Sequence, residues 1–204
     1  MVGFGSSNSP QRPVGHSPDP CASSDERRAT SDRILRLAGL VKESVVDGPG
    51  LRAVVFVQGC PHRCPGCHNP KTWDPAGGFL MTVEELWDEI KGLRLLRGIT
   101  YSGGEPFAQA APLALLAERI KGKGWDLFVY TGYTWEELQR RRTHDPGSDR
   151  LLRLADVLVD GPFILAARDP RLPFRGSRNQ RLIDLRASEG AGRSVIWEVP
   201  AWTD

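Results

Sequence analysis

The sequence predicts an α/β fold, an incomplete (β/α) barrel of about five to six strand–helix units. Short apolar runs typical of buried strands alternate with stretches that begin at helix-capping residues. A full eightfold barrel takes ~250 residues, whereas this chain has 204. Because strands joined through helices run parallel, we expect a largely parallel sheet. The expected strands are residues 34–41, 52–58, 99–101, 127–130, 157–159 and 181–185.

Two of the expected helices share the same N-terminal signal. Thr82 is followed three residues later by Glu85, and Thr134 is followed by Glu137 in the same way. In such a capping box, the hydroxyl accepts a hydrogen bond from the main chain three residues on, and the carboxylate accepts one in return. The two pairs therefore predict helices that begin directly after Thr82 and Thr134.

A third helix is expected over residues 108–121. Gly122 and Gly124 follow it, and glycine is common where a helix ends in a left-handed conformation. Near the end of the chain, the run Val-Ile-Trp-Glu-Val at residues 195–199 predicts a short strand at a sheet edge.

The beginning of the chain differs in composition from the rest. Residues 1–33 are rich in glycine, serine, proline and arginine, and they lack a periodic apolar pattern. Such a segment buries too little surface to offset the entropy of ordering it. We therefore expect a flexible N-terminal extension over residues 1–33 and one domain over residues 34–204.

The composition argues against several classes of function. The formal net charge of +2 is too small to indicate nucleic acid or a membrane surface as a partner. No apolar run approaches the ~20 residues of a membrane-spanning helix, and no secretory signal is visible. Only Cys21 stands apart from the other three cysteines. That clustering favours metal binding in a reducing cytoplasm over a disulfide framework.

Three cysteines form the most informative motif. Cys60, Cys64 and Cys67 have C-x3-C-x2-C spacing, with proline and glycine residues between and beside them that suit a tightly wrapped loop. Thiolate ligands suit iron–sulfur clusters and zinc. Three thiolates on a four-iron cube leave one iron open. The alternative is a structural zinc site completed by His62 or His68, and the motif alone does not separate the two.

A Gly-Gly-Glu turn follows the expected strand at residues 99–101. Gly103 and Gly104 bring the main chain within reach of a ligand, and the carboxylate of Glu105 suits an ammonium group. A tight turn would explain the same residue types. Parallel sheets place their ligands at the carboxyl ends of the strands. Both this turn and the cysteine loop follow strands, which favours a catalytic site over a peripheral zinc site.

These two motifs together resemble the radical S-adenosylmethionine superfamily. The segments at residues 46–52 and 56–60 are similar to those of glycyl-radical-enzyme activases. Residues 129–134, 157–163 and 175–181 resemble the branch that activates the anaerobic ribonucleoside-triphosphate reductase. The resemblance covers roughly residues 37–185 and implies that residues 34–204 are a radical S-adenosylmethionine domain.

The resemblance implies two cofactors, a [4Fe-4S] cluster and S-adenosylmethionine. Cys60, Cys64 and Cys67 would each bind one iron, and the amino and carboxylate groups of S-adenosylmethionine would chelate the fourth. Reductive cleavage would give methionine and a 5′-deoxyadenosyl radical, which would take hydrogen from a glycine of the partner enzyme. A fourth ligand at His62 would block the open iron.

The resemblance also implies roles for residues around the cluster. The main chain of Gly103 and Gly104, with Glu105, would receive the methionine amino group. Gly66 and His68 would lie against the adenine or ribose, and Thr131 and Gly132 would approach the methionyl or ribose part. Residues 47–52 would face the glycyl loop of the partner, although their types also suit a turn between two strands.

Three functions stay open at this point. The first is activation of the anaerobic ribonucleoside-triphosphate reductase, with a low-potential electron donor such as flavodoxin or ferredoxin. The second keeps the chemistry and changes the partner to pyruvate formate-lyase or another glycyl-radical enzyme. The third is a zinc-stabilised binding module without turnover. The expected location is the cytoplasm, with neither nucleic acid nor membrane as a partner.

Overall fold

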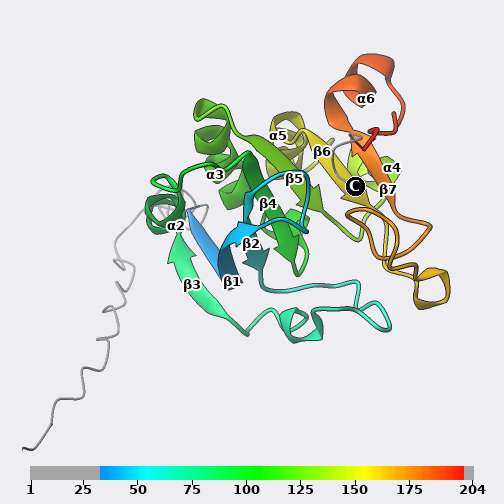
Figure 1. The fold of residues 1–204 in the computed structure, drawn as a ribbon, viewed down its shortest axis with the longest axis horizontal. Helices are drawn as coiled ribbons and strands as arrows, with labels where there is room; N and C mark the ends of the chain where they lie inside the picture. The colour runs from blue at the N-terminus through cyan, green and yellow to red at the C-terminus, as the bar shows by residue number, and fades with distance from the viewer. Residues whose placement is uncertain (1–32, 200–204) are drawn as a thin grey trace, which may run out of the picture. The chain divides into compact units, whose positions relative to one another are not determined.

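The computed structural model describes residues 33–199. These residues form one open seven-stranded sheet with the strand order β3-β1-β2-β4-β5-β6-β7 (Figure 1). The strands are β1 (Ile34–Ser44), β2 (Arg52–Val57), β3 (Phe79–Thr82), β4 (Gly98–Gly103), β5 (Asp126–Tyr130), β6 (Val157–Asp160) and β7 (Arg181–Asp184). The α/β class and the incomplete barrel expected from the sequence are confirmed. The expected extension at residues 1–33 lies outside the described residues, except for Arg33.

The middle of the sheet is parallel and its edges are antiparallel. β2, β4, β5 and β6 pair in parallel, joined by crossovers that carry helices. β1 pairs with β2 in the opposite direction because the two form a hairpin through the turn at residues 45–51. β7 returns antiparallel to β6. The six expected strands are present, but β3 was not predicted, because its four residues carry little alternation.

Both capping boxes are present. Thr82 caps α2 (Val83–Ile90), and its Oγ1 accepts from the amide of Glu85 at 3.1 Å. Thr134 caps α4 (Trp135–Arg141) through the amide of Glu137 at 3.3 Å. In each box the carboxylate accepts the cap residue's amide in return.

The remaining helices depart in part from expectation. The helix expected over residues 108–121 is a short 3-10 turn, η2 (Pro106–Gln109), followed by α3 (Ala110–Gly122). Two further helices, α5 (Pro146–Leu154) and α6 (Leu185–Ala191), were not predicted. Each begins after an aspartate cap: Asp145 accepts from the amide of Ser148, and Asp184 accepts from the amide of Ala187.

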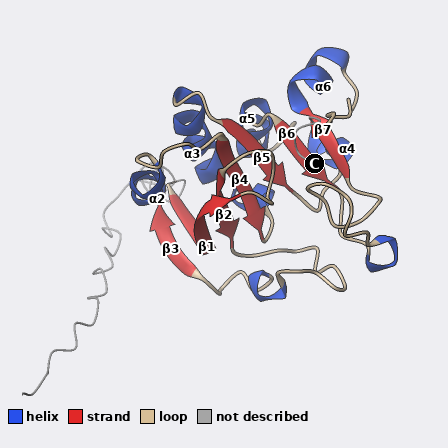
Figure 2. Ribbon diagram, in the orientation of Figure 1, coloured by secondary structure: helices blue, strands red, loops and turns tan. Residues whose placement is uncertain are grey.

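The two faces of the sheet bury different groups. On one face, alternate strand residues such as Val55, Ile99, Val129 and Leu158 pack with α2, α3 and α5 into the main core. Figure 2 shows these helices along one side of the sheet. On the opposite face, Phe128 belongs to a smaller cluster. Strand alternation therefore leaves the second face for loops and for the pocket described below.

The last expected strand is not formed. Residues 195–199 make only an isolated bridge between Ile183 and Ile196. Trp197 instead packs edge-on against Phe128, with ring centroids 5.4 Å apart. Trp197 and Val199 of this run thus cover the smaller core cluster without completing a ladder.

Candidate active site

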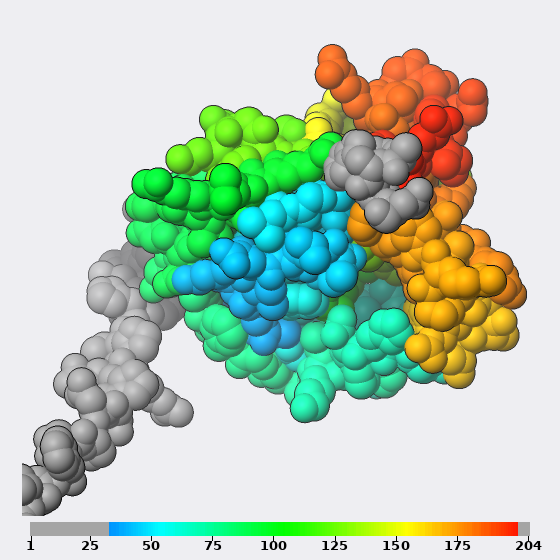
Figure 3. Space-filling view, viewed as in Figure 1, coloured from blue at the N-terminus to red at the C-terminus, as the bar shows by residue number. Residues whose placement is uncertain are grey.

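A pocket of about 370 Å³ opens at the carboxyl ends of the parallel strands. Its walls come from the cysteine loop after β2, from Ser102 to Gly104 at the end of β4, and from Tyr130 to Gly132 at the end of β5. The turn between β1 and β2 and the loop between β6 and β7 complete it. Figure 3 shows the molecule hollowed between these segments. The volume lies within the usual range of small-molecule sites.

The cysteine loop follows β2, and the chain that returns from the loop holds its first residues in place. The amide of Gly59 donates to the carbonyl of Thr72 at 2.8 Å, and that of Cys60 donates to Trp73 at 3.2 Å. The side chain of Gln58 adds bonds to the carbonyls of Lys71 and Asp74. The loop therefore folds back as a closed unit over the end of the sheet.

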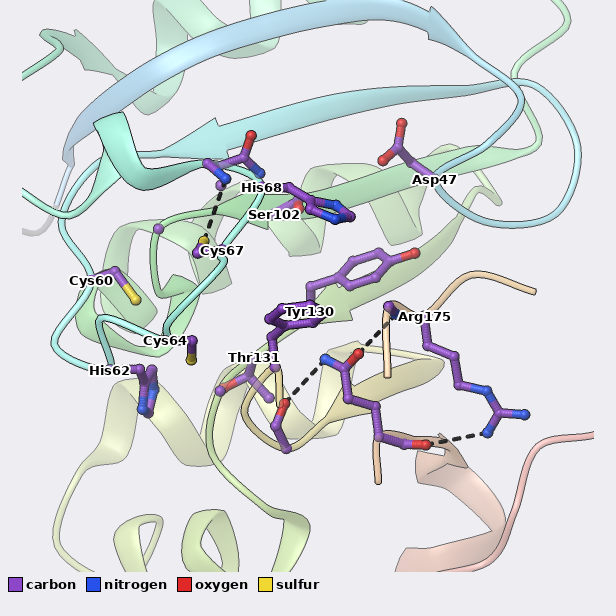
Figure 4. A pocket seen from close by; sticks show the side chains of 18 of the residues that line it. Asp47, Cys60, His62, Cys64, Cys67, His68, Ser102, Tyr130, Thr131 and Arg175 are labelled. Atoms are coloured by element: carbon purple, nitrogen blue, oxygen red, sulfur yellow. Dashed lines mark hydrogen bonds between the residues drawn. The ribbon is translucent and has the colours of Figure 1, made fainter. Parts of the chain in front are cut away.

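The three predicted cysteines come together on one side of the pocket. Cys60, Cys64 and Cys67 are free thiols of intermediate exposure, and all three line the cavity. Figure 4 shows their sulfur atoms on the side of the pocket away from Asp47 and Arg175. Burial raises the pKa of the Cys60 thiol, a cost that a bound cation would offset.

The placement of the possible ligands bears on the choice between a cluster and one zinc ion. Within residues 33–199, no three Cys, His, Asp or Glu side chains converge closely enough to hold a single metal ion. One zinc ion draws its ligands to about 2.0–2.3 Å from one centre, whereas the thiolates of an iron–sulfur cube each take a different iron. The ring nitrogen Nε2 of His62 is also engaged elsewhere, by Glu105.

The paired glycines pack the end of β4 against the cysteine loop. Gly104 donates its amide to the carbonyl of Val57, and Glu105 donates to Gly59, both at 2.8 Å. A Cβ on Gly104 would lie 2.3 Å from the carbonyl oxygen of Gly59, and Gly103 has a φ of +93°. Side chains are therefore excluded here, and the main chain of both glycines lines the pocket. Their expected contact with the methionine amino group stays a prediction.

The side chain of Glu105 is held by other parts of the protein, and its expected contact with an ammonium group stays a prediction. Its carboxylate is fully buried and is absent from the pocket lining. Oε1 accepts from the amide of Phe107 at 2.9 Å, and both oxygens accept from Oγ1 of Thr131. Oε2 also accepts from the amide of Gly132 at 2.9 Å and lies 2.8 Å from Nε2 of His62. Protein donors thus hold the carboxylate that was expected to meet an ammonium group.

Of the other predicted contact residues, His68, Thr131 and Gly132 line the same cavity, whereas Gly66 is not among its lining residues. Gly66, next to the last cysteine, lies against Leu165, which a Cβ at Gly66 would meet at 2.9 Å. The imidazole of His68 lines the pocket and stacks obliquely on Phe163, with centroids 5.6 Å apart. Thr131 and Gly132 line it from the end of β5. Their assignment to parts of S-adenosylmethionine stays a prediction.

The far wall contains residues to which no site role was assigned from the sequence. Tyr130 lines the pocket on the face away from the helices, and burial raises its pKa. Gln180 supports the loop between β6 and β7: its Oε1 accepts from the amide of Gly176, and its Nε2 donates to the carbonyl of Gly161. Strand alternation would have placed Tyr130 on this face. The loop contacts of Gln180 leave no such periodic signal.

Comparison with known proteins agrees with this geometry. Residues 46–183 match a family described as a 4Fe-4S single cluster domain. The anaerobic ribonucleoside-triphosphate reductase-activating protein of Vibrio cholerae is 40% identical over 67% of this chain and 89% of its own length. The Escherichia coli K12 protein of the same name is 39% identical over 70% of this chain and 94% of its own. The chain belongs to this family of reductase-activating proteins.

Two more distant matches add little to this family assignment. The activating protein of phage T4 is 32% identical over 67% of this chain and 86% of its own length. A solved structure, QueE from Escherichia coli, is 19% identical and covers 55% of this chain and 58% of its own. Its TM-score of 0.41 is too low to bear on the assignment. Of the helices in residues 33–199, none has the length and apolarity to cross a lipid bilayer.

The family's cofactors fit the residues present. Three free thiols supply the soft ligands that an iron–sulfur cluster takes. Beside them, two glycines that tolerate no Cβ expose main-chain groups to the cavity. A [4Fe-4S] cluster and S-adenosylmethionine are the cofactors that this site accommodates.

Proposed function

We propose that this chain activates the anaerobic ribonucleoside-triphosphate reductase by generating a glycyl radical on it. The observation that carries the proposal is the juxtaposition of three free thiols and two side-chain-free main-chain positions around one pocket. The curated relatives are named for activation of this reductase. When bound, a reduced [4Fe-4S] cluster cleaves S-adenosylmethionine to methionine and a 5′-deoxyadenosyl radical, which takes hydrogen from a glycine.

The chain's own residues hold and orient the reactants. Cys60, Cys64 and Cys67 bind the cluster and leave one iron open to S-adenosylmethionine. The main chain of Gly103 and Gly104 receives the amino group of that ligand. Gly66 and His68 contact its adenine or ribose, and Thr131 and Gly132 contact its methionyl or ribose part; the position of His68, Thr131 and Gly132 on the cavity wall supports these roles.

The walls of the pocket limit access of water to the reacting atoms. Phe56, Tyr130, Phe163 and Phe174 place aromatic rings around the cavity. Aromatic walls exclude water, which protects a reactive intermediate from side reactions. The chemistry itself belongs to the cofactor, and the protein supplies placement and shielding.

The partner approaches over the turn between β1 and β2. Val46 and Asp47 line the pocket from this turn, and Val45 and Val46 expose 69% and 73% of their surface. Two large exposed apolar side chains at the mouth of a pocket suit contact with another protein. We place the glycyl loop of the reductase here.

Residues 34–204 act as the radical S-adenosylmethionine domain, and residues 1–33 are an extension of it. A low-potential donor such as flavodoxin or ferredoxin reduces the cluster in the cytoplasm. Nucleic acid and membranes take no part.

Reconstitution with partner enzymes tests the proposal. Anaerobically reconstituted protein, S-adenosylmethionine and a low-potential reductant are mixed with the anaerobic reductase or, in parallel, with pyruvate formate-lyase. We expect a glycyl-radical EPR signal on the reductase and stoichiometric 5′-deoxyadenosine. A glycyl-radical signal on pyruvate formate-lyase alone would assign that enzyme as the partner in place of the reductase. A protein that binds zinc and cleaves no S-adenosylmethionine would refute the enzymatic function.

A further inference from the structure

His62 links the cysteine loop to the neighbouring strand ends. Its ring leaves the loop between Cys60 and Cys64 and lies 2.8 Å, through Nε2, from Oε2 of Glu105. Because a carboxylate only accepts hydrogen bonds, Nε2 carries the hydrogen. The ring also meets Tyr133 edge-on, with centroids 4.5 Å apart, and its side chain is only 17% exposed.

Glu105 joins two other segments to this contact. Its carboxylate accepts from the amide of Phe107 in η2, and from the hydroxyl of Thr131 and the amide of Gly132 beyond β5. The residue has no exposed surface. A buried carboxylate needs such donors, and each donor removed leaves charge uncompensated. The imidazole of His62 is the donor that comes from the cysteine loop.

Because Gly132 has no side chain, there is room beside it for the imidazole of His62. A Cβ at this position would lie 2.4 Å from Cδ2 and 2.7 Å from Nε2 of His62. The backbone of Gly132 is not among the positive-φ positions, so its conformation does not by itself require glycine. The requirement comes from the ring of His62.

We propose that His62 is a positioning residue that, through Glu105, fixes the cysteine loop relative to the ends of β4 and β5. The link keeps the three thiols and the paired glycines facing one cavity. Glu105 thus acts through protein contacts and leaves recognition of the ligand's amino group to the main chain of Gly103 and Gly104. What occupies the cavity rests on the proposed function, whereas the link itself rests on contacts within the chain.

Two substitutions at His62 separate positioning from simple packing. His62→Leu keeps an apolar side chain and removes the donor, while His62→Gln offers an amide donor in place of Nε2. With the three cysteines intact, we expect both variants to take up iron and sulfide in wild-type amounts. For His62→Leu we expect roughly tenfold weaker binding of S-adenosylmethionine, the scale seen when outer-shell partners are lost. The ligand-induced change in the EPR spectrum of the reduced cluster should shrink with it, and His62→Gln should restore most of both.

Hydrogen exchange of the metal-free full-length chain tests the link without any cofactor. Amides of residues 60–68 should exchange faster in His62→Leu than in the wild type, and His62→Gln should reverse this. Unchanged exchange in His62→Leu, or equal impairment of the two variants, overturns the proposal. This readout stays informative even if the chain proves to bind zinc, so failure of the link and failure of the proposed function are distinguishable.

A double-mutant cycle covers the case in which His62→Leu fails to fold. Gly132→Ala leaves His62 in place but pushes its ring from Glu105, so exchange over residues 60–68 should rise as in His62→Leu. In a His62→Ala background the added Cβ meets no ring, and Gly132→Ala should have little further effect. An effect of Gly132→Ala that is equally large in both backgrounds overturns the proposal.

Discussion

Nε of Arg52 donates to Oγ1 of Thr100 at 2.8 Å, and that hydroxyl donates to the carbonyl of Asp47 at 2.7 Å. Arg52 is fully buried, and its guanidinium also donates to the carbonyl of Pro49 and lies 2.5 Å from Asp126. A single buried cation therefore supports the underside of the turn that forms part of the pocket mouth.

Arg52→Met should destabilise the protein by roughly 3 kcal/mol, because it leaves several buried main-chain acceptors without their donor and takes one of two arginine partners from Asp126. Urea unfolding of the metal-free protein measures the change. Arg150→Met is the matched control, since its pair with Glu118 is nearly half exposed on both sides, and it should cost less than about 1 kcal/mol. Equal losses for the two variants would contradict the role given to Arg52.

Arg142 connects three helices and makes stability depend on pH. Its side chain is 10% exposed and pairs with Asp149 of α5 and Glu189 of α6. Hydrogen bonding from Arg142 lowers the pKa of Glu189, and Arg153 together with Arg142 lowers that of Asp149. Carboxylates with a lowered folded-state pKa stabilise the fold above their unfolded values of about 4 and lose that contribution as the pH falls through the folded values.

Arg142→Met should therefore lower the free energy of unfolding by roughly 1 kcal/mol at pH 7. The value is modest because both carboxylates stay partly exposed. The difference from the wild type should shrink as the pH falls below about 4. Chemical unfolding at a series of pH values measures it. The exposed pair of Lys91 and Asp88 provides the control, and Lys91→Met should change little at any pH. A stability difference between Arg142→Met and the wild type that grew in acid would contradict this prediction.

Gly104→Ala should disturb the contact between β4 and the cysteine loop. The new Cβ meets a main-chain oxygen 2.3 Å away, which has to move, and overpacking of this kind costs about 1–3 kcal/mol. We also expect less iron per chain after reconstitution. Gly39→Ala is the control because nothing lies within 4 Å of its Cβ. Similar stability and iron content for the two variants would argue against close packing at Gly104.

Cys64→Ala should abolish cluster assembly and cleavage of S-adenosylmethionine, because the proposed site supplies only three thiolates and the cluster needs all of them. Iron and sulfide analysis, visible absorbance and release of 5′-deoxyadenosine measure the loss. Cys21→Ala, which lies outside the described residues and outside the motif, should retain all three. Full cleavage activity in Cys64→Ala would count heavily against the assignment.

Val45→Asp should weaken recognition of the partner by placing a charge on the exposed turn beside the pocket. The reductase concentration that gives half-maximal radical formation should rise roughly tenfold, as expected for an interface contact. Leu95→Asp serves as the control, since Leu95 is 91% exposed and does not line the pocket. It should leave that concentration unchanged. Equal effects of the two substitutions would place the partner elsewhere.

Local signals in the sequence predicted local structure well. The capping boxes at Thr82 and Thr134 depend on residues three apart, and both formed as expected. The antiparallel edges of the sheet and the packing of Trp197 against Phe128 were not predicted. These features depend on contacts between distant segments, which leave no periodic pattern within either one.

The sequence by itself determined the α/β class, the order of the strands along the chain and the ligand chemistry of the cysteine loop, because spacing and residue type set these locally. Only the tertiary structure decided where Glu105 points. Its carboxylate lies within hydrogen-bond distance of donors on His62, Thr131 and Gly132. A buried charge is stable only with several hydrogen bonds, and here the donors come from segments up to 43 residues away from Glu105 in the chain.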